Sequence, residues 1–202
     1  MPRNAEGARK RLLQAALELF AENGFDHTTA AQIAARAGVT ERTFFRHFPD
    51  KREVLFGGEA VLGTALSNAI TQAPPALSPI DTMRRAFASV TDMIEQNRRF
   101  AEPRRRIVAA TPALREREVA KHAALTRAMA EALQKRGVEA RRADLAAHAG
   151  LAVMSYAIDA WFADPSVRLG DYLDRAFIEL QGLSSSTGDE ATPQASRSSV
   201  LG

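Results

Sequence analysis

Residues 28–56 read TTAAQIAARAGVTERTFFRHFPDKREVLF and carry the clearest structural signal in the chain. Thr29, followed three residues later by Gln32, predicts the capped start of a short helix. Gly38 predicts a tight turn after that helix, because glycine adopts positive φ at little cost. Thr40 predicts the cap of a second short helix. Two short helices joined by a glycine turn are typical of a helix-turn-helix, whose second helix enters the major groove of DNA.

The residues around this motif predict a small three-helix core. Leu12, Ala16 and Phe20 would share one face of a preceding helix, because residues four apart lie above one another on a helix. Ile33 and Phe44 would close the core from the two helices of the motif. We therefore expect the first 50 residues to form a three-helix DNA-binding domain.

The rest of the chain predicts further helices and no strands. Apolar residues recur at spacings of three and four, and no stretch follows the two-residue period of a strand. The expected helices are 50–73 with a bend at Gly57–Gly58, about 78–94, 103–110, 111–136, 140–163 and 169–180. The predicted fold class is all-α, with a helix-turn-helix domain over 1–50, a larger helical domain over 51–183 and a disordered tail over 184–202.

The composition excludes several kinds of site. The 202-residue chain has no cysteine, so disulfides, thiolate zinc sites, iron–sulfur clusters and cysteine nucleophiles are ruled out. The sequence holds no glycine-rich phosphate loop, no HExxH and no G-x-S-x-G motif. Its N-terminal stretch is unlike a signal peptide, and no apolar run reaches the roughly 18 residues of a membrane span. We expect no cofactor, no metal, no membrane association and a cytoplasmic location.

The positive charge is concentrated near the N-terminus. Lysine and arginine total 27 against 24 aspartates and glutamates, which gives a formal net charge of +3. The first 52 residues hold nine of the basic groups and six of the acidic ones, so the whole surplus lies in this quarter of the chain. A local surplus favours a polyanionic partner, although a mixed solvated surface would give the same count.

The segment 28–56 resembles the DNA-binding domain of the tetracycline-repressor (TetR/AcrR) family of bacterial transcriptional regulators. The resemblance implies a regulator that is not an enzyme, that acts most often as a repressor, and that leaves a palindromic operator when a small, apolar effector binds. One helix-turn-helix reads only a few base pairs, so we expect a homodimer on double-stranded DNA. Helices 140–163 and 169–180 are the expected dimer contact, although 140–163 could instead serve only as core. Domain 51–183 would then bind the effector and dimerise.

The resemblance also assigns DNA contacts to single residues. Thr29 and Lys51 stand where the family contacts phosphates. Arg42 is expected to read guanine and Glu41 to accept from cytosine. Phe45 replaces the family's usual tyrosine, which leaves contact with a thymine methyl as the alternative to a phosphate bond. The full predicted set is Thr29, Thr40, Glu41, Arg42, Thr43, Phe45, Arg46, His47 and Lys51. Nonspecific contacts are expected from Arg3, Arg9, Lys10 and Arg11.

An effector pocket is expected among the apolar residues of the larger domain. Aromatic and methionine side chains suit an adaptable apolar pocket, although each of them could instead be ordinary core packing. The expected lining residues are Leu62, Leu66, Met83, Phe87, Met129, Met154 and Trp161.

Three other interpretations stay open. An architectural DNA-binding protein without an effector would share the same motif. An all-helical enzyme or metal protein could use Asp144 and His148, which share a helix face, although such a pair is usually a surface pair. Arg104, Arg105 and Arg106 form either a second basic patch or a solvated helix face.

Overall fold

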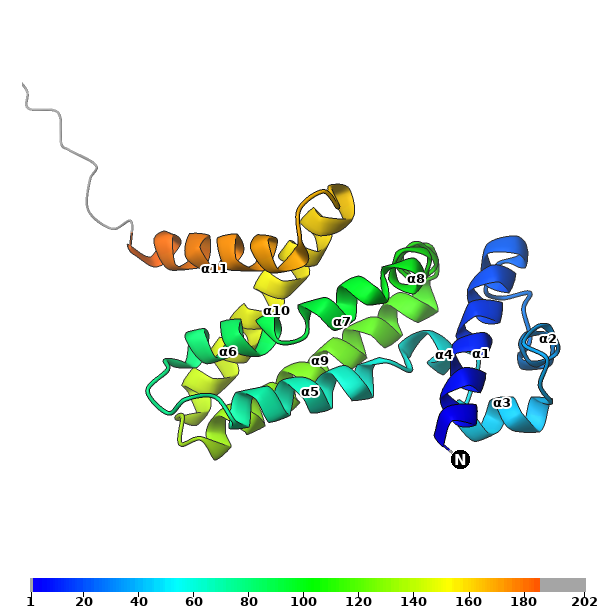
Figure 1. Ribbon diagram of the computed structural model, residues 1–202, viewed down its shortest axis with the longest axis horizontal. Helices are drawn as coiled ribbons and strands as arrows, with labels where there is room; N and C mark the ends of the chain where they lie inside the picture. Colours follow the sequence, from blue (N-terminus) through cyan, green and yellow to red (C-terminus); the bar gives the residue numbers. More distant parts are fainter. Residues whose placement is uncertain (1, 186–202) are drawn as a thin grey trace, which may run out of the picture.

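The computed structural model describes residues 2–185, and the secondary structure over this range is helical. The predicted all-α fold class is confirmed for these residues. The helices are α1 (Pro2–Asn23), α2 (Ala30–Arg36), α3 (Glu41–His47), α4 (Glu53–Phe56), α5 (Glu59–Thr71), α6 (Pro79–Ala88), α7 (Thr91–Gln96), α8 (Arg98–Ala110), α9 (Pro112–Lys135), α10 (Ala140–Ala163) and α11 (Leu169–Ser185). Figure 1 shows α1–α3 grouped at one end of an elongated molecule, with α5–α11 forming the larger body and α4 between the two.

The helix-turn-helix forms at the predicted positions for the predicted local reasons. Thr29 Oγ1 accepts from the Gln32 backbone N–H at 3.2 Å, and Gln32 Oε1 accepts from the Thr29 N–H at 2.8 Å, which completes the capping box. Thr40 Oγ1 accepts from the Thr43 N–H at 3.2 Å and so caps α3. Gly38 has a φ of +67°, the left-handed conformation that this turn requires.

The helices α1–α4, which we call the reading domain, share a hydrophobic core with two later helices. Phe44 of α3 is completely buried in this core. Phe100 and Val108 of α8 and Leu114 of α9 join it from the larger part of the molecule. The boundary at residue 50 stays a prediction, but the packing on both sides of it is continuous.

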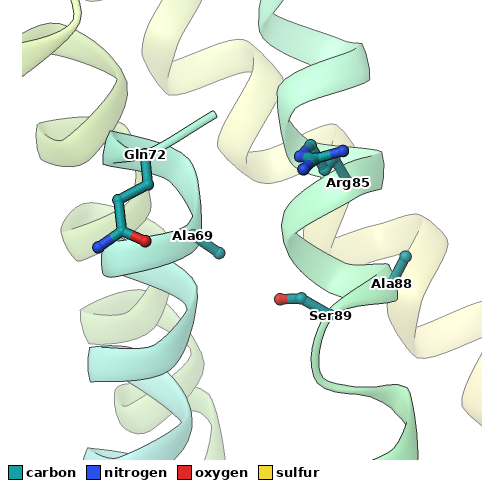
Figure 2. Close-up of a pocket in the computed structure, with 5 residues that line it drawn as sticks. All are labelled: Ala69, Gln72, Arg85, Ala88 and Ser89. Atoms are coloured by element: carbon teal, nitrogen blue, oxygen red, sulfur yellow. The ribbon is translucent and has the colours of Figure 1, made fainter. Parts of the chain in front are cut away.

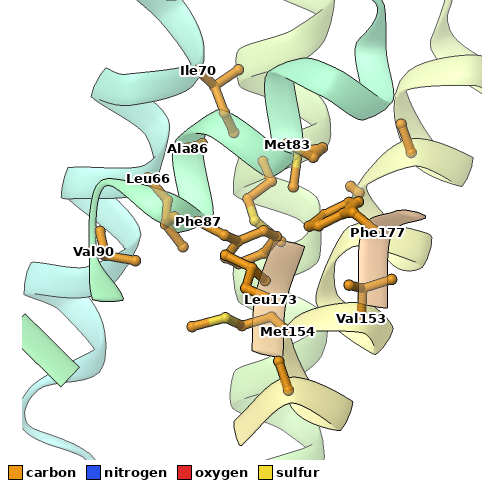
Figure 3. Close-up of a cluster of buried hydrophobic side chains, with 14 of the residues drawn as sticks. Leu66, Ile70, Met83, Ala86, Phe87, Val90, Val153, Met154, Leu173 and Phe177 are labelled. Carbon is orange, nitrogen blue, oxygen red and sulfur yellow. The ribbon is translucent and has the colours of Figure 1, made fainter. Parts of the chain in front are cut away.

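A second core fills the larger part of the molecule and centres on α10. Buried side chains of α5, α6, α9, α10 and α11 form one cluster, in which Met83, Phe87 and Phe177 lie close together (Figure 3). The helix α10 packs against α6, α9 and α11. It is therefore the central helix of this part.

The helices expected over 78–94 and from Pro103 onward differ from the structure. The helix expected over 78–94 breaks after Ala88. Ser89 Oγ donates to the Ala86 carbonyl at 2.7 Å and Thr91 Oγ1 to the Ala88 carbonyl at 3.0 Å, and such side-chain bonds compete with the helix ladder. The helix expected to start at Pro103 starts five residues earlier. The half-buried first turn, anchored by Phe100, outweighs the single backbone bond that proline removes.

The chain also differs from the expected helices at the glycine pair and at its last helix. The bend expected at Gly57–Gly58 is an interruption that separates α4 from α5. The last helix continues to Ser185, beyond the expected end near residue 180. The disordered tail expected over 184–202 lies, from residue 186 onward, outside the described residues.

Two stretches are long and apolar enough, by length and composition, to cross a membrane. They are Glu53–Thr71 and Ala140–Ala163, each with a mean hydropathy of 1.2 over its best window. Neither is an uninterrupted apolar run. Core helices of soluble proteins pass the same test, and α10 is such a central helix here, so this is weak evidence for a span.

Candidate nucleic-acid interface

One face of α3 is free to enter a DNA groove. Phe44 anchors the opposite face in the core of the reading domain, with its ring 5.7 Å from that of Phe48. The predicted contacts Glu41, Arg42 and Phe45 are exposed on the outer face, as are Thr40 and Arg46. The structure therefore brings together on this helix and its cap the contacts predicted from Thr40 to His47.

The two arginines of α3 are available for an anionic partner. Within the described range, neither Arg42 nor Arg46 has an acidic partner at ion-pair distance. Arg36 of α2 differs, because its guanidinium lies 2.9 Å from Glu22 and 3.4 Å from Glu18 of α1. Arg36 is therefore neutralised within the protein, and the unpaired positive charge of the motif lies on α3.

The surroundings of His47 favour its neutral form. Burial, followed by the positive charges of Arg46 and Arg9, lowers the pKa of His47 below its usual value of 6.5. Its Nε2 atom is buried and has no hydrogen-bond partner in the described part of the chain.

The two predicted phosphate contacts outside α3 are both engaged within the protein. The Thr29 hydroxyl accepts from the Gln32 N–H and also lies 3.1 Å from Gln32 Oε1. Lys51 Nζ donates to the carbonyls of Phe25, Asp26 and Thr28 at 2.7, 3.3 and 3.0 Å. An ammonium has three donors, so all of them are used. The phosphate roles of these two residues stay predictions, and for Lys51 one of these bonds would have to open.

Two of the N-terminal basic residues, Arg9 and Arg11, donate hydrogen bonds to backbone carbonyls of the protein itself. Arg9 Nη2 donates to the Gly57 carbonyl at 2.6 Å, and its guanidinium lies over the Phe48 ring at 4.9 Å. Arg11 Nε donates to the Ala37 carbonyl at the end of α2 at 3.2 Å. Sequence reasoning missed these roles, because the partners lie 26 or more positions away and no local pattern indicates them.

The seven residues expected to line an effector pocket pack as core. Leu66, Met83, Phe87, Met129, Met154 and Trp161 are buried in the second cluster, and Leu62 packs against it. These side chains fill the space between the helices themselves. A cavity of about 460 Å³ lies instead at the surface between α5 and α6, lined by Ala69, Gln72, Arg85, Ala88 and Ser89 (Figure 2).

A second cavity lies between the reading domain and the larger part of the molecule. It measures about 520 Å³ and is lined by Phe20 and Phe25 on one side and by Ile107 and Pro112 on the other. Sequence reasoning did not find it, because its walls come from segments about 80 residues apart.

The Asp144–His148 pair lies on the surface. His148 Nδ1 is 3.6 Å from Asp144 Oδ1, and both side chains are mostly exposed. Among residues 2–185 no group of three or more histidines, cysteines, aspartates or glutamates is placed to hold a metal ion.

One half-buried carboxyl, with a buried Oε2 atom, lies where α5 begins. Glu59 Oε2 has no hydrogen-bond partner among the described residues, and Lys121 Nζ is 4.0 Å away. Burial raises the pKa of Glu59 to about 7, against the opposing effect of Arg104 and Lys121.

A pH dependence of stability follows from this carboxyl. Between pH 4.5, where the unfolded group titrates, and pH 7, the folded protein holds a proton that the unfolded chain lacks. Raising the pH across this window should therefore lower the free energy of unfolding, by at most about 1.4 kcal/mol per pH unit, with no further loss above it. Urea unfolding at pH 5, 6, 7 and 8 measures this loss of stability in the wild-type protein. The Glu59→Gln variant should not show it. The exposed Glu116→Gln is the control, and a parallel pH profile for Glu59→Gln and wild type would contradict the assignment.

The sequence and structure match known proteins along most of the chain. Residues 12–56 match the model of bacterial regulatory proteins of the tetR family, and residues 77–183 match the MftR C-terminal domain. The chain is 39% identical over 88 residues to the transcriptional regulator TcmR of Streptomyces glaucescens, an alignment that covers 44% of this chain and 39% of TcmR. It is 25% identical over 187 residues to the regulator MftR of Mycobacterium tuberculosis, covering 88% of this chain and 94% of MftR.

Solved structures share the fold at low sequence identity. A TetR-family regulator from Syntrophomonas wolfei superposes with a TM-score of 0.65 at 16% identity, over 92% of this chain and 99% of that one. SmeT in complex with triclosan superposes with a TM-score of 0.58 at 22% identity, over 85% and 90%.

Fold and interface together define a helix-turn-helix DNA-binding protein with a large helical C-terminal part. The model of the MftR C-terminal domain matches more than half of the chain, and this match shows the family. The chain belongs to the TetR family of bacterial regulatory proteins, and it is a DNA-binding transcriptional regulator.

Proposed function

We propose that this regulator is a cytoplasmic repressor, without enzymatic activity, that binds a palindromic operator as a homodimer and is released by a small-molecule effector. The observation that carries the DNA-binding part is the exposed face of α3. Arg42 and Arg46 lie there without acidic partners in the described range, on a helix that Phe44 fixes to the core.

The homodimer is supported by the apolar surface of the last two helices. Leu145 and Tyr156 of α10 and Ile178 of α11 are large apolar side chains that lie exposed in the single chain. A second copy would cover this surface, and a two-fold axis there would present two recognition helices to two half-sites. Residues 51–183 would then serve both dimerisation and effector binding.

The effector site is supported by the cavity between α5 and α6. Its wall combines the methyl groups of Ala69 and Ala88 with the polar groups of Gln72 and Arg85 (Figure 2). Such a wall favours a ligand with an apolar body and a hydrogen-bonding or anionic group. Related folds have been solved with triclosan, in SmeT, and with lauroyl-CoA, in FadR of Thermus thermophilus.

Selection of fragments from the source genome by the purified protein would test this function. The expected result is enrichment of a palindrome whose half-sites are centred about one helical turn, or a multiple of it, apart. Recovery of fragments without a shared sequence would instead favour the architectural DNA-binding alternative. A screen of amphipathic small molecules against the protein–DNA complex would then test release.

Arg42→Ala should relax base preference in the selected operator. We expect discrimination at one base pair of each half-site to fall by roughly 1–3 kcal/mol, because a bidentate arginine–guanine contact is lost. Arg46→Ala, four residues further at the groove edge, should weaken binding to all sequences alike. Competition binding with single-base operator variants measures both effects, and identical specificity profiles for the two variants would contradict these roles.

A further inference from the structure

The three consecutive arginines of α8 have three different surroundings. Arg106 is 78% exposed and bonds to Glu102 of its own helix at 2.7 Å. Arg105 lies 2.7 Å from Asp159 of α10. The Arg104 side chain is only 24% exposed and reaches inward. The sequence alone could not separate these roles, because the three residues are chemically identical.

Arg104 touches the helices on both sides of the junction between the reading domain and the larger part. Its Nε donates to the Leu55 carbonyl of α4 at 2.7 Å, and its guanidinium lies 4.7 Å from the centre of the Phe56 ring. Its Nη1 donates to Glu118 of α9 at 3.0 Å, and its Nη2 to Glu59 of α5 at 3.4 Å. One side chain of α8 therefore connects α4, α5 and α9.

These contacts surround the glycine pair through which the backbone passes from the reading domain to the larger part. Only Gly57 and Gly58 separate α4 from α5, and glycine gives a chain little resistance to bending. A Cβ on Gly57 would lie 2.6 Å from Arg9 Nη2 and 2.9 Å from the Phe48 ring, so α1 and the end of α3 also meet here. The reading domain is therefore held to the larger part at this joint as well as through the core that it shares with α8 and α9.

The helix that carries Arg104 is also fixed to the central helix of the larger part. Arg98 of α8 lies over the Trp161 ring of α10 at 4.5 Å, and Arg105 pairs with Asp159. In Figure 1, α8 lies beside α1 on one side and reaches the end of α9 on the other. A displacement of α10 would therefore reach the joint through α8.

We propose that Arg104 is the positioning residue of this joint: through Leu55, Glu59 and Glu118 it holds the reading domain in one orientation, and loss of these contacts lets the domain reorient about Gly57–Gly58. The part of the proposal that concerns DNA affinity rests on the proposed function, whereas the part that concerns orientation does not.

Protonation of Glu59 should act on the same joint. The charged groups around this carboxyl are Arg104 of α8, Lys121 and Glu118 of α9, and Glu53 of α4. Its pKa, about 7 when the joint is closed, would fall toward 4.5 once opening exposes it to water. The closed joint, in which Arg104 makes its contacts, thus binds the proton more tightly than the open one. Lowering the pH from 8 to 6 should therefore favour the closed joint.

The orientation can be measured without DNA, because the chain has no cysteine and accepts label pairs directly. Ala35→Cys on α2 and Ala124→Cys on α9 are exposed sites outside the joint. Spin labels at both sites, in labelled protein diluted with unlabelled protein, report the distance within one protomer. We compare Arg104→Ala with Arg106→Ala, a matched control on the same helix, and verify helix content by circular dichroism.

The expected result is a broader or double distance distribution for Arg104→Ala, and an unchanged one for Arg106→Ala. Affinity for the selected operator should fall on the order of tenfold for Arg104→Ala and should not change for Arg106→Ala. The wild-type distribution should broaden from pH 6 to pH 8, and that of Glu59→Gln should not. Glu118→Ala, which removes a single bond, should broaden the distribution less and covers the case in which Arg104→Ala does not fold.

Equal distributions for the two arginine variants would overturn the positioning role. Where Arg104→Ala does not fold, an unchanged distribution for Glu118→Ala would overturn it. If Arg104→Ala broadens the distribution but the protein selects no operator, the positioning role of Arg104 stands and the proposed function is rejected.

Discussion

Phe44→Ala should lower the free energy of unfolding by about 3–5 kcal/mol, the usual cost of emptying a phenylalanine site in a packed core. Phe44 is 0% exposed, and its ring meets those of Phe45 and Phe48 at 5.4 and 5.7 Å. The reading domain is small, so a loss of this size would unfold most of it at ambient temperature. Urea unfolding followed by circular dichroism would show this loss as an early transition.

The neighbouring phenylalanine supplies the control. Phe45 is 51% exposed on the outer face of α3, so Phe45→Ala should change stability by no more than about 0.5 kcal/mol. Its effect should appear in operator binding instead. Equal destabilisation by the two substitutions would mean that α3 is rotated from the orientation described above, and the predicted DNA-contact face would be wrong with it.

Lys51→Met should destabilise the reading domain by about 1.5–3 kcal/mol even when no DNA is present, because hydrogen bonds to a charged donor are among the stronger ones in proteins. The substitution keeps an apolar stem near the Phe25 ring, over which Lys51 Nζ now lies at 4.3 Å. It removes the donor that serves the Phe25, Asp26 and Thr28 carbonyls. Thermal unfolding of the free protein measures the effect.

Arg46→Ala is the comparison for Lys51→Met, since Arg46 is a basic residue of the same domain without an acidic partner among residues 2–185. We expect Arg46→Ala to leave the stability of the free protein unchanged. If Lys51→Met also leaves it unchanged and only weakens DNA binding, then the phosphate role predicted from the family is the correct one and the internal bonds contribute little.

The fold was predictable where the signals are local. The capping box at Thr29, the cap at Thr40 and the left-handed turn at Gly38 all depend on residues within four positions of one another, and all three form. The break after Ala88 was missed for a related reason. Ser89 and Thr91 are tolerated in a helix, and only their bonds to the preceding carbonyls show that they end it.

The candidate site was predictable only in part. Helical spacing identified the outer face of α3, because Phe44 had to be buried. It could not show that Lys51 and Arg9 turn inward, since their partners are backbone carbonyls of distant segments. Nor could it separate a pocket from a core: the same apolar pattern describes Met83 and Met129 whether they line a void or, as here, fill it.

The core that the reading domain shares with α8 and α9 has a consequence for engineering. Hybrid regulators are made by joining the N-terminal module of one protein to the sensor of another. Here, a splice near residue 50 would separate Val54, Leu55 and Phe56 from the helices they were selected with, and would place Phe100, Val108 and Leu114 against a foreign surface. A workable hybrid has to carry both sides of that contact from the same parent.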